Sequence, residues 1–240
     1  MSRYRIADFS VEIPDDSPWM QRIAADYRAD GPAPLDMTLS IDAAELEHYT
    51  ELAPQIPQDL LKAQLYGVSF FRQQLAFDAF SFHASALTMD NGAYLFSAPS
   101  GTGKSTHARL WKQRFGDRVS ILNDDKPTLR LTDDGCRVYG TPWCGKHQIN
   151  TNGSAVLKAI VFLKRGEENR IRRLHGNDVL RAVLEQCLCD IRTSDQMVRL
   201  MNMLDRVLSN TPVYELHCTV DEMAAQLVYD TVQREEGTGK

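Results

Sequence analysis

The sequence predicts a mixed α/β fold, in which a largely antiparallel sheet carries a phosphate-binding loop. Short apolar runs recur at strand length, and three turns between them have hairpin signals, at 90–92, at 133–135 and around Gly166. Strands joined by such short turns run antiparallel, because parallel neighbours need a long crossover. A further segment, 98–105, has the spacing of a phosphate loop and lies between an apolar run and a helical pattern.

Length, composition and charge are those of an ordinary globular protein. The 240 residues are 43% apolar and 25% charged, which is enough for a sizeable core. A net charge of −5 gives no overall basic field, so we expect no nucleic-acid partner. The five cysteines form no paired framework, and no apolar run is long enough to cross a bilayer. We therefore expect a cytoplasmic protein with no membrane partner.

The first part of the chain is expected to be a small accessory unit. Alternating apolar residues predict two strands with a short helix between them, and these elements lie at 9–13, 35–41 and 17–27. Pro54 and Pro57 then mark a linker. We expect residues 1–55 to form an N-terminal β-α-β unit and residues 56–240 to form a nucleotide-binding domain.

The second part begins with a helix from Pro57, whose apolar residues recur at helical spacing as far as Leu75. The strands expected to pair as hairpins are 81–89 with 93–97, 128–131 with 137–140, and 155–163 with 169–174. Further strands are expected at 119–122 and 214–220, and further helices at 106–115, 180–187, 197–208 and 221–234.

The loop at 98–105 has residues that hold a nucleotide. Its glycines let backbone N–H groups point at phosphate oxygens, Lys104 can reach the β and γ phosphates, and the Ser105 hydroxyl can bind Mg²⁺. His107 lies one turn into the following helix, where it either packs or contacts the nucleotide edge, or takes part in the chemistry. The residues expected to contact ATP are Ser100, Gly101, Thr102, Gly103, Lys104, Ser105, Thr106 and His107.

A second source of metal ligands follows the strand at 119–122. This apolar run ends in Asn123, Asp124 and Asp125. Successive side chains of a strand point to opposite faces. One carboxylate can therefore meet the Mg²⁺ held by Ser105, while its neighbour accepts a proton from an attacking hydroxyl.

Together these motifs resemble those of a known family. His83, the Ser-Gly-Thr-Gly-Lys-Ser loop at 100–105 and the Asn-Asp-Asp run at 123–125 resemble the HPr kinase/phosphorylase family. The loop is also similar to that of ATP-dependent phosphoenolpyruvate carboxykinase, which shares that fold. The resemblance covers about residues 80–165 and includes the Tyr-Gly-Thr-Pro-Trp-Cys-Gly-Lys segment at 139–146.

The resemblance implies a role for three polar residues. Asp124 would be the catalytic base, Asp125 the Mg²⁺ ligand and His83 an active-site histidine. The chain departs from the family at Ala98, where glycine is usual, and a Cβ there costs about 1 kcal/mol if the backbone needs a positive φ. The Gly- and Arg-rich HPr-docking signature that follows the two aspartates in the family is not recognisable here.

We therefore expect an ATP- and Mg²⁺-dependent kinase that transfers the γ-phosphoryl group to a serine-type hydroxyl of a peptide, protein or small molecule. The expected catalytic residues are Asp124, Lys104 and His83, and the expected metal ligands are Ser105 and Asp125. Two alternatives stay open, a nucleotide sensor without turnover and a carboxykinase-type enzyme. The chain has no Asn-Lys-x-Asp or Asp-x-x-Gly motif, which disfavours a GTPase.

Two basic features have no single interpretation. Lys146 follows Gly145 and either adds a cation to the phosphate site or lies on a turn. Five further cations form either a solvated hairpin or a docking site for an acidic acceptor, and they are Lys164, Arg165, Arg170, Arg172 and Arg173. An oligomer is compatible with the sequence.

Overall fold

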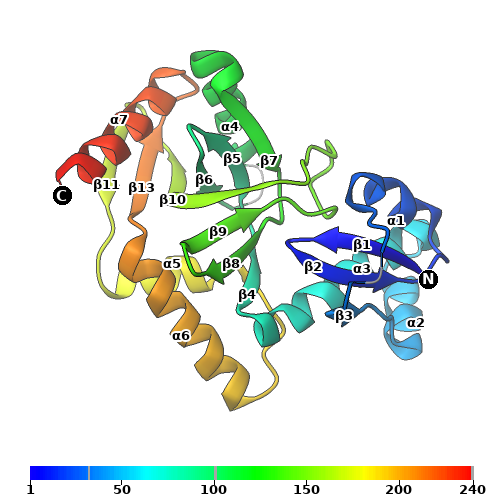
Figure 1. The fold of residues 1–240 in the computed structure, drawn as a ribbon. Coiled ribbons are helices and arrows are strands. Elements are labelled where there is room, and N and C mark those ends of the chain that lie inside the picture. Colours follow the sequence, from blue (N-terminus) through cyan, green and yellow to red (C-terminus); the bar gives the residue numbers. More distant parts are fainter. Residues whose placement is uncertain (32, 100–101, 239–240) are drawn as a thin grey trace.

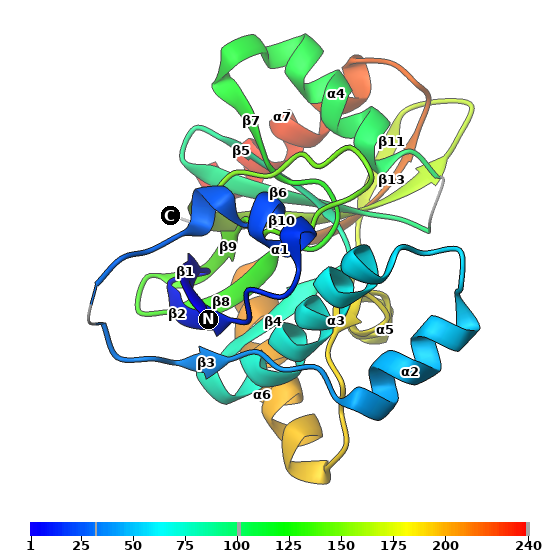
Figure 2. The same cartoon turned by 90° about the vertical axis from the view of Figure 1, so that its right-hand side faces the viewer.

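The computed structural model describes residues 1–31, 33–99 and 102–238. Within these residues it holds two sheets, one of three strands near the N-terminus and one of ten strands in the remainder. Figure 1 shows the small sheet to the right of the large one, and Figure 2 shows the same arrangement from that side.

The N-terminal sheet is a hairpin with one short added strand. Its region contains β1 (Ser2–Ile6), β2 (Phe9–Ile13), α1 (Pro18–Ile23), η1 (Ala25–Tyr27) and β3 (Met37–Thr38). β1 was not predicted, although Tyr4 and Ile6 are buried in the alternating pattern of a strand. The strand expected at 35–41 shortens to two residues, because only Met37 and Thr38 pair with β2.

Two helices connect this sheet to the rest of the chain, α2 (Ala43–Leu52) and α3 (Gln58–Gln73), and α3 continues into η2 (Gln74–Phe77). α2 was not predicted, because it buries no residue and so has no apolar stripe. α3 was predicted, and its Tyr66 and Phe70 share one core with the N-terminal sheet and with Trp143. The division at residue 55 stays a prediction.

The large sheet is mixed and mostly antiparallel, as predicted. Its strands are β4 (Ala79–Phe82), β5 (Ser85–Met89), β6 (Gly92–Ser97), β7 (Val119–Asn123), β8 (Thr128–Thr132), β9 (Gly135–Tyr139), β10 (Ser154–Arg165), β11 (Arg170–Arg173), β12 (Cys187–Leu188) and β13 (Val213–Cys218). The order is β12-β4-β8-β9-β10-β6-β5-β7, with β13 beside β10 and β11 beside β13. Among the described strands of this sheet, the parallel pairs are β10 with β6 and β10 with β13.

Two of the three expected hairpins are confirmed, β5 with β6 and β8 with β9. The third is wrong in its pairing, although both of its strands exist. β13 lies between β10 and β11, parallel to the first and antiparallel to the second. A strand 40 or so residues later in the chain therefore takes the place that a local hairpin would give to β11. The expected strand at 81–89 is also divided, because the chain leaves β4 at His83 and begins β5 at Ser85.

Helices cover both faces of the large sheet (Figure 1). α4 (Lys104–Phe115) and α7 (Met223–Thr238) pack on one face, and α5 (Asn177–Leu184) and α6 (Ser194–Asn210) pack on the other. Trp111 fills the first core and Leu204 the second, both fully buried. A short turn, η3 (Gly116–Arg118), joins α4 to β7. None of the helices in the described ranges combines the length and apolar character needed to span a membrane.

Candidate functional site

Four strand ends meet at one edge of the large sheet. β6, β10 and β13 run parallel, and β7 has the same direction because β6 and β7 both pair antiparallel with β5. Their last residues are Ser97, Arg165, Cys218 and Asn123. The start of the predicted phosphate loop and the pair Asp124 and Asp125 therefore lie at the same edge, where the C-terminal ends of strands commonly form binding sites.

The described part of the predicted phosphate loop has the expected strand, turn and helix order. Ser100 and Gly101, two of the predicted nucleotide contacts, lie outside the described residues. Gly103 precedes α4 with a φ of 118°, a conformation that favours glycine. Ala98 is buried and is not among the residues of positive φ, so the backbone cost considered for a Cβ at this position does not arise.

Lys104 bends back over the loop. Its Nζ donates a hydrogen bond to the carbonyl oxygen of Ala98 at 2.9 Å. Burial lowers the pKa of the Lys104 ammonium, while the charges of Asp125 and Asp124 act in the opposite direction. Lys104 therefore lies close enough to both carboxylates for their charges to favour its protonated form.

Asp124 is held firmly and is almost covered, with 5% of its surface exposed. Its N–H donates to the carbonyl of Ile149 at 3.1 Å, and its Oδ1 lies 3.1 Å from the Ser85 hydroxyl, which donates to it. The other carboxylate oxygen, Oδ2, lies 3.3 Å from the point where a Cβ on Gly145 would be. A side chain at position 145 would therefore crowd Oδ2, which the glycine avoids.

Asp125 is ionised at neutral pH. Its Oδ1 lies 3.4 Å from Nε2 of His83, and its Oδ2 forms an ion pair with Lys126. Burial raises the pKa of Asp125, but the hydrogen bond from His83 and the charge of Lys126 outweigh it and lower the pKa to about 2. The structure thus brings His83 and Asp125 into contact.

Asn123 fixes the turn that carries the two carboxylates, a role that was not predicted. Its Oδ1 accepts hydrogen bonds from the N–H groups of Asp125 at 2.8 Å and Lys126 at 2.7 Å. Its Nδ2 donates to the carbonyl of Thr141 at 3.0 Å. The signal was present in the sequence, because an Asn before a polar turn commonly bonds the backbone two or three residues later.

A second unpredicted contributor is Gln186. Its carbonyl accepts the N–H of His83 at 2.9 Å, and its Oε1 lies 3.1 Å from the Ser97 hydroxyl. That hydroxyl also lies 2.9 Å from the carbonyl of His83. Gln186 therefore ties the end of β6 to the histidine of the site.

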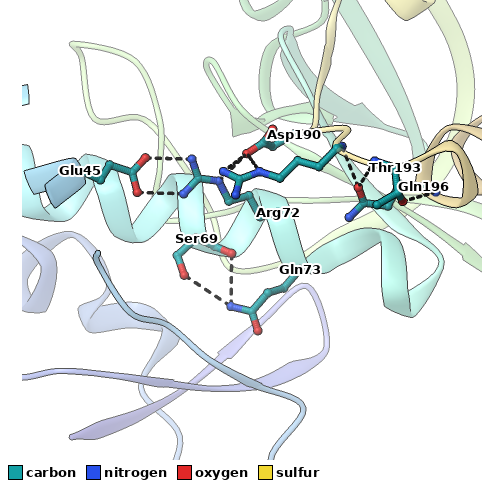
Figure 3. Close-up of polar contacts among 8 residues, drawn as sticks. Glu45, Ser69, Arg72, Gln73, Asp190, Thr193 and Gln196 are labelled. Atoms are coloured by element: carbon teal, nitrogen blue, oxygen red, sulfur yellow. Dashed lines mark hydrogen bonds and ion pairs between the residues drawn. The ribbon is translucent and has the colours of Figure 1, made fainter. Parts of the chain in front are cut away.

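The segment after Gln186 is anchored from a distance. Figure 3 shows Arg72 of α3 between Glu45 of α2 and Asp190, with bonds of 2.8 and 2.9 Å to the first and 2.8 Å to the second. Three segments far apart in sequence meet at this arginine. It fixes the chain between β12 and α6, and hence supports the position of Gln186.

His107 is a core residue in this structure, with 3% of its surface exposed. Its Nε2 accepts the indole N–H of Trp111 at 3.1 Å, and its ring packs on Phe96 at 4.7 Å. Burial lowers the pKa of His107 to about 4, so the ring is neutral and its proton is on Nδ1. Among the described residues, Nδ1 has no hydrogen-bond partner.

A pocket of about 480 Å³ lies beside the start of α4. One wall comes from Thr102, Gly103, Thr106, His107 and Leu110, and the other from the ends of β10 and β13 with the residues that follow, 163–166 and 218–220. Val220 at its rim is 81% exposed, unusual for an aliphatic side chain. The expected nucleotide contacts of Thr102, Gly103, Thr106 and His107 thus line one hollow.

Two further predicted residues, Ser105 and Lys146, make no described hydrogen bond to the residues of the site. Ser105 lies in the first turn of α4, and no hydrogen bond joins it to Asp125 among the described residues. Within those same residues, no cluster of three or more His, Cys, Asp or Glu side chains is arranged to hold a metal ion. Lys146 is exposed in the turn after Gly145.

The comparisons with known proteins show a likeness among solved structures alone. No family model matches the chain, and no curated protein matches it significantly. Among solved structures, the chain is similar to the Hpr(Ser) kinase/phosphatase from Coxiella burnetii, with 11% sequence identity and a TM-score of 0.36. The match covers 66% of this chain and 96% of that one.

Proposed function

We propose that this protein is an ATP- and Mg²⁺-dependent kinase that transfers the γ-phosphoryl group to a hydroxyl on a peptide, protein or small molecule. One observation carries the proposal: β6, which leads into the predicted phosphate loop and Lys104, and β7, which leads into Asp124 and Asp125, end at the same edge of the sheet. Catalysis of phosphoryl transfer depends mainly on positioning and charge neutralisation, which such a group of charges can supply.

Lys104 would exchange its bond to the carbonyl of Ala98 for phosphate oxygens. The exchange places a cation on the β and γ phosphates, where negative charge must be neutralised. The N–H groups at the start of α4 support the same phosphates, because the N-terminus of a helix favours anions.

Asp125 fits a Mg²⁺ ligand. Its carboxylate is ionised at neutral pH, and carboxylate and hydroxyl oxygens are the ligands that Mg²⁺ prefers. Phosphate-bound Mg²⁺ commonly takes only one or two protein ligands, so Asp125 with Ser105 would suffice. When bound, the ion neutralises phosphate charge, and His83 keeps the Asp125 carboxylate oriented from its Oδ1 side.

Asp124 would orient the acceptor. The Ser85 hydroxyl holds Oδ1, and Oδ2 is the oxygen left to accept a hydrogen bond from an incoming hydroxyl. The nucleoside would lie in the pocket of about 480 Å³ that opens beside the first turn of α4. The two substrates are then bound by different elements: α4 binds the nucleotide, and the turn after β7 binds the acceptor.

A nucleotide sensor without turnover is the second candidate. The observation that favours it is the burial of Asp124, whose 5% exposure leaves little room for an acceptor in the present conformation. A sensor would bind ATP and Mg²⁺ but would need no base.

Transfer of label from γ-labelled ATP separates the two functions. The full-length protein is incubated with Mg²⁺ and a panel of serine-containing peptides and small alcohols, with Lys104→Ala as the inactive control. A kinase labels at least one acceptor in a Lys104-dependent way. Tight ATP binding without labelling of any acceptor or of water favours the sensor, and labelling by Lys104→Ala at the wild-type rate contradicts the assigned site.

A further inference from the structure

Glu215 is a carboxylate in the middle of β13 that is surrounded by cations. Its side chain is 8% exposed, and its Oε2 forms an ion pair with Lys164 at 2.6 Å. Its Oε1 pairs with Arg172 at 2.8 Å and lies 3.2 Å from Nε2 of His217. The Lys164 and Arg172 side chains come from the strands on either side and are 56% and 55% exposed.

The charge of Glu215 does not neutralise both Lys164 and Arg172. One carboxylate faces two permanent cations, so a positive excess remains on a protein whose net charge is −5. Arg172 directs Nε and Nη2 toward Glu215, and its Nη1 has no partner among the described residues. A planar guanidinium held in this way has an edge available for a second carboxylate or phosphate.

The cation cluster lies on the same face and at the same edge as the end of β6. In the sheet register, Phe162 pairs with both Ser97 and Glu215, and Glu215 pairs with Arg172. Paired residues share a face, so the Ser97 and Arg172 side chains leave the sheet on the same side. Three strand spacings separate them, roughly 14 Å.

The opposite face of this edge is covered by α4, and the pocket beside α4 extends to the strand edge, where Lys164 is one of its lining residues. The face that Ser97 shares with Arg172 also holds His83, whose carbonyl contacts Ser97 and whose ring contacts Asp125. In Figure 2, β13 and β11 lie on the side of the molecule from which α4 begins. An acceptor on this face can therefore reach the carboxylate pair and the cation cluster together.

We propose that Lys164 and Arg172, held in place by Glu215, form a docking site for an acidic peptide acceptor, one that carries Asp or Glu residues near its target hydroxyl. The inference rests on the proposed phosphotransfer and specifies its substrate. A buried carboxylate is a costly way to stabilise a strand, since an apolar residue does so without desolvating a charge. Its use here is explained if the strand must hold two exposed cations in fixed positions.

Peptide binding tests this proposal without any phosphate transfer. Three fluorescent peptides share one central serine and differ in their flanks, which are all Glu, all Gln or all Lys, and anisotropy measures their binding to the full-length protein without nucleotide. We expect the Glu peptide to bind at least about 10-fold more tightly than the Gln peptide at low salt, with the difference reduced at about 300 mM salt.

Two variants locate the binding. Arg172→Gln should weaken binding of the Glu peptide by about 5- to 10-fold, as expected for a lost charge-assisted contact. Arg206→Gln is the matched control, because Arg206 is exposed on α6, and should change binding less than about 2-fold. Thermal unfolding checks that both variants are folded.

Equal binding of the Glu and Gln peptides overturns the docking site, and so does an equal effect of the two arginine variants. The result is independent of the kinase proposal. A protein that binds the acidic peptide through Arg172 but labels no acceptor contradicts the kinase function alone, whereas a kinase that shows no acidic preference contradicts only the docking site.

Discussion

Substitution of Gly145 by alanine tests how Asp124 meets its acceptor. A Cβ at this position would lie 3.3 Å from Asp124 Oδ2 and 3.6 Å from the Cβ of Asp125. Gly145 is not among the residues of positive φ, so alanine is compatible with the backbone. The substitution therefore shifts the carboxylate by a few tenths of an ångström and crowds its Oδ2, while the fold is kept.

We expect the Gly145→Ala protein to transfer phosphate to a hydroxyl acceptor about 10-fold more slowly, or roughly 1.4 kcal/mol of added barrier. The affinity for ATP and Mg²⁺, measured by calorimetry, should change less than about 2-fold, because the phosphate loop is untouched. Gly153→Ala is the matched control on the same connection, since its Cβ would meet only ordinary contacts at 3.8 Å and 3.9 Å.

Two results would refute this reasoning. The first is an unchanged transfer rate in Gly145→Ala, measured with an acceptor that the wild-type protein labels. The second is an equal loss of rate in Gly153→Ala, which would show that the loop, and not the oxygen of Asp124, is sensitive to added bulk.

The remaining predictions concern binding and pH. Lys104→Ala should weaken the binding of ATP and Mg²⁺ in calorimetry and abolish turnover, because Lys104 is the assigned phosphate cation; unchanged affinity would mean that the nucleotide binds elsewhere. Burial raises the pKa of Glu215, but bonds from Lys164, Arg172 and His217 outweigh it and lower the pKa to about 2. The ionised carboxylate therefore stabilises the fold above its usual pKa of 4.5, and this stabilisation is lost as pH falls from about 4.5 toward about 2. Urea unfolding should show a larger loss of stability between pH 5 and about 3 for wild type than for Glu215→Gln; parallel losses would count against the ion pairs.

Local chemistry made much of the fold predictable from sequence. The Asp-Asn-Gly run before β6 predicts its hairpin within a few residues, and in the structure the two-residue loop is Asp90 and Asn91, both of positive φ, with Gly92 beginning β6. The helix α3 was predictable from its apolar stripe, and the order of strand, loop and α4 from the phosphate-loop pattern.

Features that depend on distant residues were not predictable. β13 inserts between β10 and β11, and no local signal in either strand indicates that partner. The bond from Arg72 to Asp190 spans 118 positions, so the anchoring of the Gln186 segment is visible only in the structure. In the site, the two adjacent aspartates were conspicuous, whereas the roles of Ser85 and Gly145 depend on which atoms approach Asp124 after folding.

The most direct test of the central claim compares Asp124→Asn with wild type in two assays, label transfer from γ-labelled ATP and calorimetric binding of ATP with Mg²⁺. The amide keeps an oxygen that can accept the Ser85 hydroxyl, so the turn should persist. We predict nearly unchanged ATP affinity with a transfer rate lowered about 10²- to 10⁴-fold, with the lower end favoured because phosphoryl transfer depends more on positioning than on proton removal. Transfer at the wild-type rate by Asp124→Asn would contradict the account.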